Sequence, residues 1–75
     1  MDIHKIINDF YSEDFRAGVI ELIVYSMDRD YLLESQQKYD KIIIGSYQVR
    51  CSVLAEMNAN KPIKKYGLKI QFDKL

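Results

Sequence analysis

The chain has 75 residues, of which 48% are hydrophobic and 29% are charged, a composition typical of a folded globular protein. This length supports one hydrophobic core, so we expect a single compact domain over residues 1–75. A core of this size leaves about 3 to 5 kcal/mol of net stability, which is little to hold strained catalytic geometry in place. We therefore expect a protein that is not an enzyme.

Short apolar runs and a single cysteine bear on the cellular compartment. The apolar runs are too short for a membrane span or for the core of a signal peptide. Cys51 is the only cysteine, so it cannot form an internal disulfide, whereas a small secreted domain would normally need several. We expect a cytoplasmic protein with no membrane contact. The abundance of Ile, Lys, Tyr, Asp and Asn is typical of bacterial genomes and of mobile elements such as phages.

Charge is distributed unevenly along a chain whose formal net charge is zero. Residues 1–30 contain seven acidic and three basic residues, for −4, whereas residues 61–75 contain five lysines and one aspartate, for +4. This asymmetry predicts an acidic N-terminal part and a basic tail, whose charges solvate opposite faces and partly attract each other.

The N-terminal part has helical periodicity. Four apolar residues follow the i, i+3, i+4, i+7 spacing of one helix face and predict a helix over residues 2–11: Ile3, Ile6, Ile7 and Phe10. Ser12 is a second start signal, and the apolar stripe that follows it predicts a longer helix over residues 13–28. That stripe consists of Phe15, Val19, Leu22, Ile23 and Met27.

Residues 19–26 also support a different interpretation. They are rich in β-branched side chains, and Gly18 would cost a mid-helix position about 1 kcal/mol. The alternative is a strand over residues 19–26, which would add a third strand to the sheet. Under either interpretation, Asp28 or Asp30 caps a shorter helix that continues to about Tyr39.

Two alternating segments end the chain. Residues 43–57 have apolar or small residues at odd positions, and residues 65–73 have apolar residues at even positions. Asn and Pro between them favour a turn, so we expect a long antiparallel hairpin whose apolar face the helices must cover. The predicted fold class is α+β, with two or three N-terminal helices packed on one face of a C-terminal antiparallel β-hairpin.

Parity also predicts the register of the hairpin. Apolar residues at odd positions of one strand and even positions of the other share a face only if paired positions sum to an odd number. A four-residue loop at residues 59–62 satisfies this condition. The predicted pairs are Val53 with Leu68, Cys51 with Ile70, and Val49 with Phe72.

Candidate catalytic and metal-binding residues are sparse. His4 is the only histidine and Cys51 the only cysteine, which excludes the usual zinc sites. We expect His4 to be solvated on the first helix and Cys51 to be buried on the apolar face of its strand. Asp28 and Asp30 lack the further ligands of an EF-hand and are interpreted as helix caps. We expect no catalytic residue, no metal and no cofactor.

Tyrosine is the residue type that stands out, with six in the chain. It is enriched at protein interfaces because it combines a large apolar ring with a hydroxyl. Tyr31 and Tyr39 lie eight positions apart, near the same face of the last predicted helix, and form the preferred exposed pair. We therefore predict a non-catalytic protein-binding module, a small regulator or inhibitor, that contacts another protein through these tyrosines together with Arg29, Gln36 and Lys38.

Helices followed by a hairpin also match the order of a winged-helix DNA-binding protein. Residues 29–41 would then be the reader helix and the hairpin tip at residues 58–66 the wing. The nucleic-acid contacts would be Lys61, Lys64, Lys65 and Lys69. Nucleic acid ranks second as a partner because the reader helix also carries several carboxylates and the chain is neutral.

The edges of the predicted hairpin offer a further contact. Lys65 and Lys69 discourage strand addition along the second strand, so added strands would prefer the edge formed by residues 43–53. A homodimer through a hairpin edge is one form of this contact.

Overall fold

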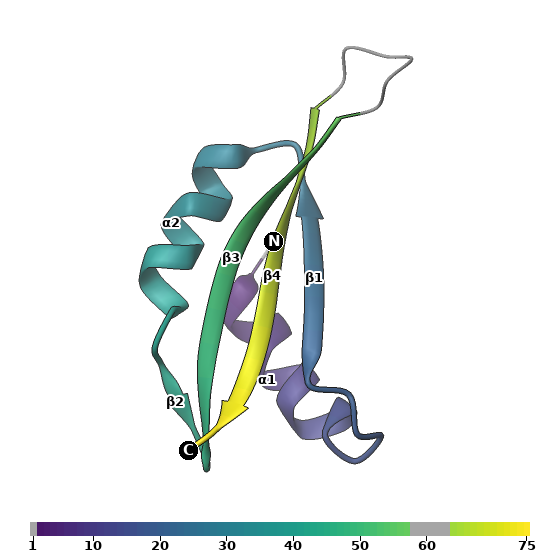
Figure 1. Ribbon diagram of the computed structural model, residues 1–75, viewed down its shortest axis with the longest axis vertical. Coiled ribbons are helices and arrows are strands. Elements are labelled where there is room, and N and C mark those ends of the chain that lie inside the picture. The colour runs from purple at the N-terminus through teal and green to yellow at the C-terminus, as the bar shows by residue number, and fades with distance from the viewer. Residues whose placement is uncertain (1, 58–63) are drawn as a thin grey trace.

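The computed structural model describes residues 2–57 and 64–75, which form two helices and four strands (Figure 1). The elements follow in the order α1 (Ile3–Asp14), β1 (Glu21–Ser26), α2 (Arg29–Tyr39), β2 (Ile43–Ile44), β3 (Tyr47–Met57) and β4 (Lys64–Lys74). All strand pairs are antiparallel, in the order β1-β4-β3-β2. The fold is α+β as predicted, but the sheet has four strands rather than the two of a hairpin.

Helix α1 confirms the first predicted helix and continues to Asp14. The Asp2 carboxylate caps it by accepting hydrogen bonds from the backbone N–H groups of His4 and Lys5, at 3.1 and 3.3 Å. The predicted apolar face is buried against the sheet at Ile3, Ile7 and Phe10.

The predicted helix over residues 13–28 is wrong, and the alternative strand has the right position. Residues 15–18 form a turn in which Gly18 has a φ of 80°, a left-handed conformation that ends a helix. Strand β1 then pairs along β4, where the buried Val24 lies opposite Leu68. The helical stripe forms no face, since Val19 and Met27 are 44% and 69% exposed.

Helix α2 confirms the last predicted helix and its cap. The Asp28 carboxylate accepts a hydrogen bond from the Tyr31 N–H at 3.0 Å, and Asp30 lies in the first turn. The buried residues of α2 are Leu32, Ser35 and Tyr39. The Ser35 hydroxyl donates to the Tyr31 carbonyl at 2.9 Å, which satisfies this buried polar group.

Strands β3 and β4 pair in the predicted register. The structure places Val49 opposite Phe72, Cys51 opposite Ile70, and Val53 opposite Leu68. Parity predicted these pairs because a slip by one residue would turn every apolar side chain to the other face. The predicted loop at residues 59–62 lies outside the described residues.

A turn divides the predicted strand over residues 43–57 into β2 and β3. Ile43 of β2 lies opposite Gln48, so the chain reverses at residues 45–46. Gly45 has a φ of 59°, and a Cβ at this position would collide with the Tyr11 hydroxyl. Only glycine meets both conditions without strain.

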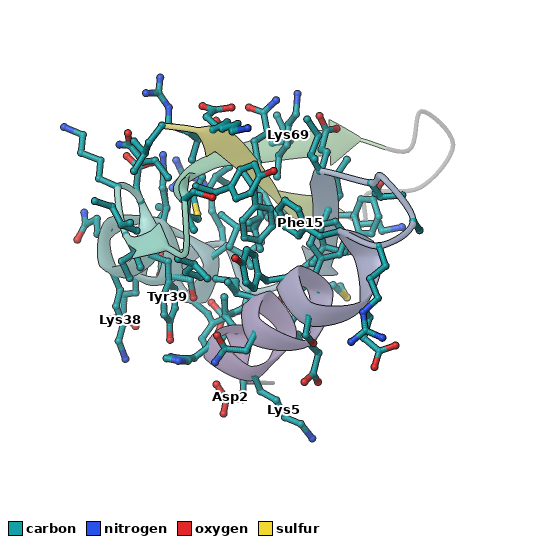
Figure 2. The ribbon with its side chains drawn as sticks, turned by 90° about the horizontal axis from the view of Figure 1, so that it is seen from below. Asp2, Lys5, Phe15, Lys38, Tyr39 and Lys69 are labelled. Carbon is teal, nitrogen blue, oxygen red and sulfur yellow. The ribbon has the colours of Figure 1, made fainter. Side chains whose placement is uncertain are left out.

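Both helices cover the same face of the sheet, with α2 beside β3 and α1 crossing behind the strands (Figures 1 and 2). The rings of Phe10 and Phe72 stack with centroids 5.3 Å apart, and the Phe15 ring lies edge-on to Phe72 at 5.1 Å. The buried residues of the sheet are Val24, Val49, Cys51, Leu68, Ile70 and Phe72. No helix in the described part of the chain is long and apolar enough to cross a membrane.

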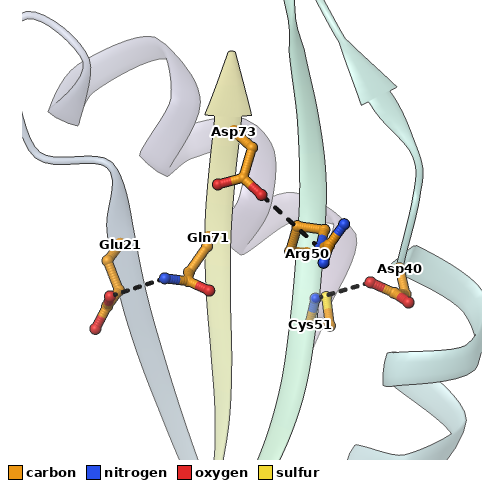
Figure 3. A network of polar contacts seen from close by, with 6 residues as sticks. All are labelled: Glu21, Asp40, Arg50, Cys51, Gln71 and Asp73. Atoms are coloured by element: carbon orange, nitrogen blue, oxygen red, sulfur yellow. Dashed lines mark hydrogen bonds and ion pairs between the residues drawn. The ribbon is translucent and has the colours of Figure 1, made fainter. Parts of the chain in front are cut away.

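The other face of the sheet carries polar side chains (Figure 3). The Lys69 Nζ lies 3.6 Å from the Glu21 Oε2, and the Gln71 side-chain amide donates to the same oxygen at 3.4 Å. The Arg50 Nε lies 3.8 Å from the Asp73 Oδ2. None of the described helices covers this face, which is therefore open.

Candidate protein-binding surfaces

An apolar groove with a volume of about 280 Å³ lies between α1 and β2. Isoleucine and other apolar side chains form most of it, with two polar side chains from α1. Its lining residues are His4, Ile7, Asn8, Tyr39, Ile42, Ile43, Ile44 and Val49. We call it the α1–β2 groove.

The segment that leaves α2 builds one wall of this groove. Lys41 has a φ of 72°, which is uncommon for a residue with a Cβ, and its N–H donates to the Val49 carbonyl at 2.8 Å. The Val49 N–H donates in turn to the Ile42 carbonyl at 2.8 Å. These bonds hold Ile42 and Ile43 at the groove with 37% and 62% of their surface exposed.

Asp40 fixes the same segment to β3. Its Oδ1 accepts a hydrogen bond from the Cys51 N–H at 3.0 Å (Figure 3). The Gln36 side-chain amide donates to the Cys51 carbonyl at 3.2 Å. The side chains of Gln36 in α2 and of Asp40, the residue that follows α2, thereby satisfy the Cys51 backbone of β3 beyond the residues that pair with β2. Hydrogen bonds as well as packing therefore hold the groove wall in place.

The chemical groups near the groove do not form a nucleophilic pair. Burial, and secondarily the charge of Asp40, raises the pKa of the Cys51 thiol from 9.0 to about 11, so the thiol is protonated at neutral pH. Cys51 is buried, as predicted, and is not part of the groove lining. His4 is exposed, as predicted, and contacts the Tyr39 ring edge-on at 6.0 Å. Among the described residues, no group of three His, Cys, Asp or Glu side chains could hold a metal ion.

The predicted partner-binding residues of α2 do not form one exposed surface. Tyr39 is only 8% exposed, so it is wrong as a member of an exposed pair, and Tyr31 is half-buried. Tyr31, Lys38 and Tyr39 do line a second groove of about 460 Å³ between α1 and α2. Gln36 is engaged with β3, and Arg29 is exposed at the start of the helix.

Two of the lysines predicted to contact nucleic acid, Lys65 and Lys69, each contact a side chain of β1. The Lys65 Nζ lies 4.0 Å from the Tyr25 ring centroid, in cation–π geometry, and Lys69 pairs with Glu21. Lys64 begins β4, and Lys61 lies outside the described residues. The two lysines whose side chains the structure describes therefore have partners within the sheet.

The open edge of the sheet differs from the predicted one. β2, Asp40 and Gln36 cover the β3 edge as far as Cys51, so the prediction that strands add along residues 43–53 is wrong for that part of the edge. The second predicted edge, along β4, is paired with β1. Within the described residues, the outer edge of β1 is open along its length, whereas β3 is uncovered only beyond Cys51.

Hydrogen bonding shows which groups of β1 point outward. The Phe72 N–H donates to the Ile20 carbonyl at 3.1 Å, so even-numbered residues of β1 bond to β4. The N–H and C=O groups of Glu21, Ile23 and Tyr25 therefore point away from the sheet. Within the described residues, no hydrogen bond to these outward groups is present.

Sequence reasoning missed both the α1–β2 groove and the open edge. The run Ile42–Ile44 was the signal for the groove, since isoleucines in a row cannot all face one core from a strand. The signal for the edge was the β-branched content of residues 19–26, which favoured the alternative strand. Comparison with protein-family models, curated proteins and solved structures found no match to this chain.

Proposed function

We propose that this protein is a small non-catalytic protein-binding module, a regulator or inhibitor that binds another protein through the α1–β2 groove. The observation that carries the proposal is the exposure of Ile43, at 62%, and of Ile42, at 37%, beside an apolar groove. Exposed apolar side chains gathered at a concave site are typical of interaction surfaces.

The size of the groove favours a partner's side chain over a free small molecule. Pockets that enclose drug-sized ligands measure about 300 to 1,000 Å³, and this groove lies just below that range at about 280 Å³. Large apolar side chains of a partner can enter such a groove and exclude water from its isoleucines. Buried anchors of this kind supply most of the binding energy in protein interfaces.

Two polar side chains complete the groove as an interface. His4 and Asn8 lie on successive turns of α1, and both are exposed. Their side chains can hydrogen-bond to the backbone that flanks an inserted apolar residue. A polar rim around an apolar centre is the usual anatomy of a protein interface.

Nucleic acid remains the second-ranked partner. Arg29 and Lys38 of α2 are offset by Asp30 and Glu34, so the proposed reader helix has no net positive charge over Arg29–Tyr39. Gln36 is held by the Cys51 carbonyl and would have to leave it to contact a base. Sequence readers rely on free polar side chains and on a basic surface.

Capture from a lysate of the source cells tests the proposal, with and without nuclease treatment. We expect Ile43→Asp to abolish capture of the partner by placing a charge in the groove. Leu75→Asp is the matched control, because Leu75 is 67% exposed and does not line the groove. Equal capture by both variants, or capture that nuclease abolishes, contradicts the proposal.

A further inference from the structure

The outer edge of β1 has the properties of a strand that pairs with a second strand. Its six residues form the border of the sheet (Figure 1). Three of them present unpaired N–H and C=O groups outward. Natural proteins block such edges with proline, lysine, bulges or covering segments. Glu21 is the only charged residue in β1, which contains no proline or lysine.

We propose that this edge pairs with β1 of a second copy of the chain, which yields a two-fold symmetric dimer with one continuous antiparallel sheet. The occupant is a second copy because the strand is complementary to itself in one register. Two-fold pairing requires outward-pointing residues to oppose outward-pointing residues. Centring the axis on Ile23 is the one register that pairs all three of them: Ile23 with Ile23 of the second copy, and Glu21 with Tyr25 of the second copy in both directions.

Charge complementarity supports this register. The Lys65 Nζ lies 4.0 Å from the Tyr25 ring centroid on the open face of the sheet. Glu21 of one copy, opposite Tyr25 of the other, therefore meets Lys65 of the other copy, and symmetry repeats the contact. Lys69 and Gln71 both contact the Glu21 Oε2, so the Oε1 is available to the second copy. Exposed pairs contribute little energy but select a register.

Apolar side chains support the same pairing on both faces of the sheet. On the open face, two Ile23 side chains meet on the axis, next to Tyr25, which is 45% exposed. On the helical face, Leu22 opposes Val24 of the second copy. A groove lined by Ile6, Phe10 and Leu22, together with Asp9 and Glu13, lies beneath the edge. Because the C-terminal end of α1 leads into β1 at its Glu21 end, the two-fold axis places these ends of the two α1 helices toward opposite ends of the interface.

Analytical ultracentrifugation of the full chain over a range of concentrations tests the proposal. We expect a monomer–dimer equilibrium that Ile23→Pro abolishes, since proline removes an outward N–H that β4 does not use. Val53→Pro is the matched control. Val49 and Cys51 direct their N–H groups to the outer edge of β3, so Val53 does the same on the opposite edge of the sheet. A monomer at concentrations up to about 1 mM, or a dimer abolished by Val53→Pro and not by Ile23→Pro, overturns the proposal.

Charge reversal provides a test that does not depend on how well proline is tolerated. We expect Glu21→Lys and Lys65→Glu each to raise the dimer Kd about tenfold, because two symmetric ion pairs become repulsive. An equimolar mixture of the two variants should form heterodimers in preference to either homodimer, as measured by native mass spectrometry. A statistical mixture overturns the proposed register. Ile43→Asp should leave the dimer intact, so this result and the groove proposal are separable.

Discussion

The hydrogen bond between Asp40 and the Cys51 backbone connects the end of α2 to β3, and substitution of Asp40 tests the architecture of the α1–β2 groove. The Asp40 Oδ1 accepts the Cys51 N–H at 3.0 Å in a partly buried position. Asp40→Ala leaves that amide without an acceptor, and we expect a loss of about 1 to 3 kcal/mol in the free energy of unfolding. For a domain of this size, Tm falls roughly 4 to 8 °C for each kcal/mol.

Asp40→Asn separates the hydrogen bond from the charge. The asparagine side chain keeps an oxygen acceptor, so we expect it to cost less than about 1 kcal/mol. Both variants should lower the pKa of the Cys51 thiol from about 11, because the charge of Asp40 is the second cause of its elevation. Burial, the larger cause, should keep that pKa above 9.0 in both variants.

Two measurements check these expectations. Denaturant unfolding followed by circular dichroism gives the free energies, and the rate of thiol alkylation as a function of pH gives the Cys51 pKa. Equal destabilisation by Asp40→Asn and Asp40→Ala would show that the amide has no dependence on the side-chain acceptor. An unchanged pKa in both variants would show that the carboxylate does not act on the thiol.

Further predictions concern Cys51, Gly45 and Asp28. Cys51→Ser should destabilise the fold by about 1 to 3 kcal/mol in denaturant unfolding, because it buries a poorly satisfied hydroxyl. Because the Cys51 pKa is raised, the folded state holds the thiol proton more strongly than the unfolded state does. The free energy of unfolding of the wild type should therefore fall as the pH rises from about 9 to 11. Cys51→Ser should lack this pH-dependent loss of stability. Gly45→Ala should lower the free energy of unfolding by at least about 1 kcal/mol, because an alanine is strained at a positive φ. Adding Tyr11→Phe to this variant should remove the collision between the new Cβ and the Tyr11 hydroxyl but not the backbone strain. Asp28→Ala should cost about 1 kcal/mol and increase amide exchange in the first turn of α2.

The register of the hairpin could be predicted from two local features, the alternation of apolar residues in each strand and the length of the loop between the strands. Each strand of the hairpin buries one face, so the parity of its apolar residues determines which side chains can share a face. Cys51 and Ile70 meet for this reason. Helix caps were equally predictable, since the Asp28 carboxylate needs only the next few residues to satisfy the first-turn amides.

The position of β1 was ambiguous because its apolar residues occupy both faces. Leu22 and Val24 point to the helical layer, whereas Ile23 and Tyr25 lie on the open face, so the strand shows no alternation. Together with Val19 and Met27, such a run also fits a helical stripe. What decides in favour of a strand is its pairing with β4, between residues that lie 40 to 50 positions apart in the chain, and no local pattern contains that contact.

The burial of Tyr39 has a similar long-range cause. Spacing along α2 correctly placed Tyr31 and Tyr39 near one face of the helix, but it could not show what lies against that face. In the structure, α1 approaches the C-terminal end of α2, where His4 contacts the Tyr39 ring. Tyr39 therefore forms part of two groove walls instead of a protruding contact.

Pairing of β1 with β4 also explains why the open edge is unprotected. As an outer strand of a two-stranded hairpin, β4 would present Lys65 and Lys69 along an edge, where they deter strand addition. Addition of β1 makes β4 an inner strand, and the two lysines then contact Tyr25 and Glu21 on the open face. Lys65 and Lys69 therefore no longer lie at the border of the sheet, where they would deter strand addition. At the other border, β2 and α2 cover part of β3. β1 and β2 are the two border strands of the sheet (Figure 1), and Ile43 and Ile44 of β2 line the α1–β2 groove. A dimer through β1 therefore leaves both copies of the groove free to bind.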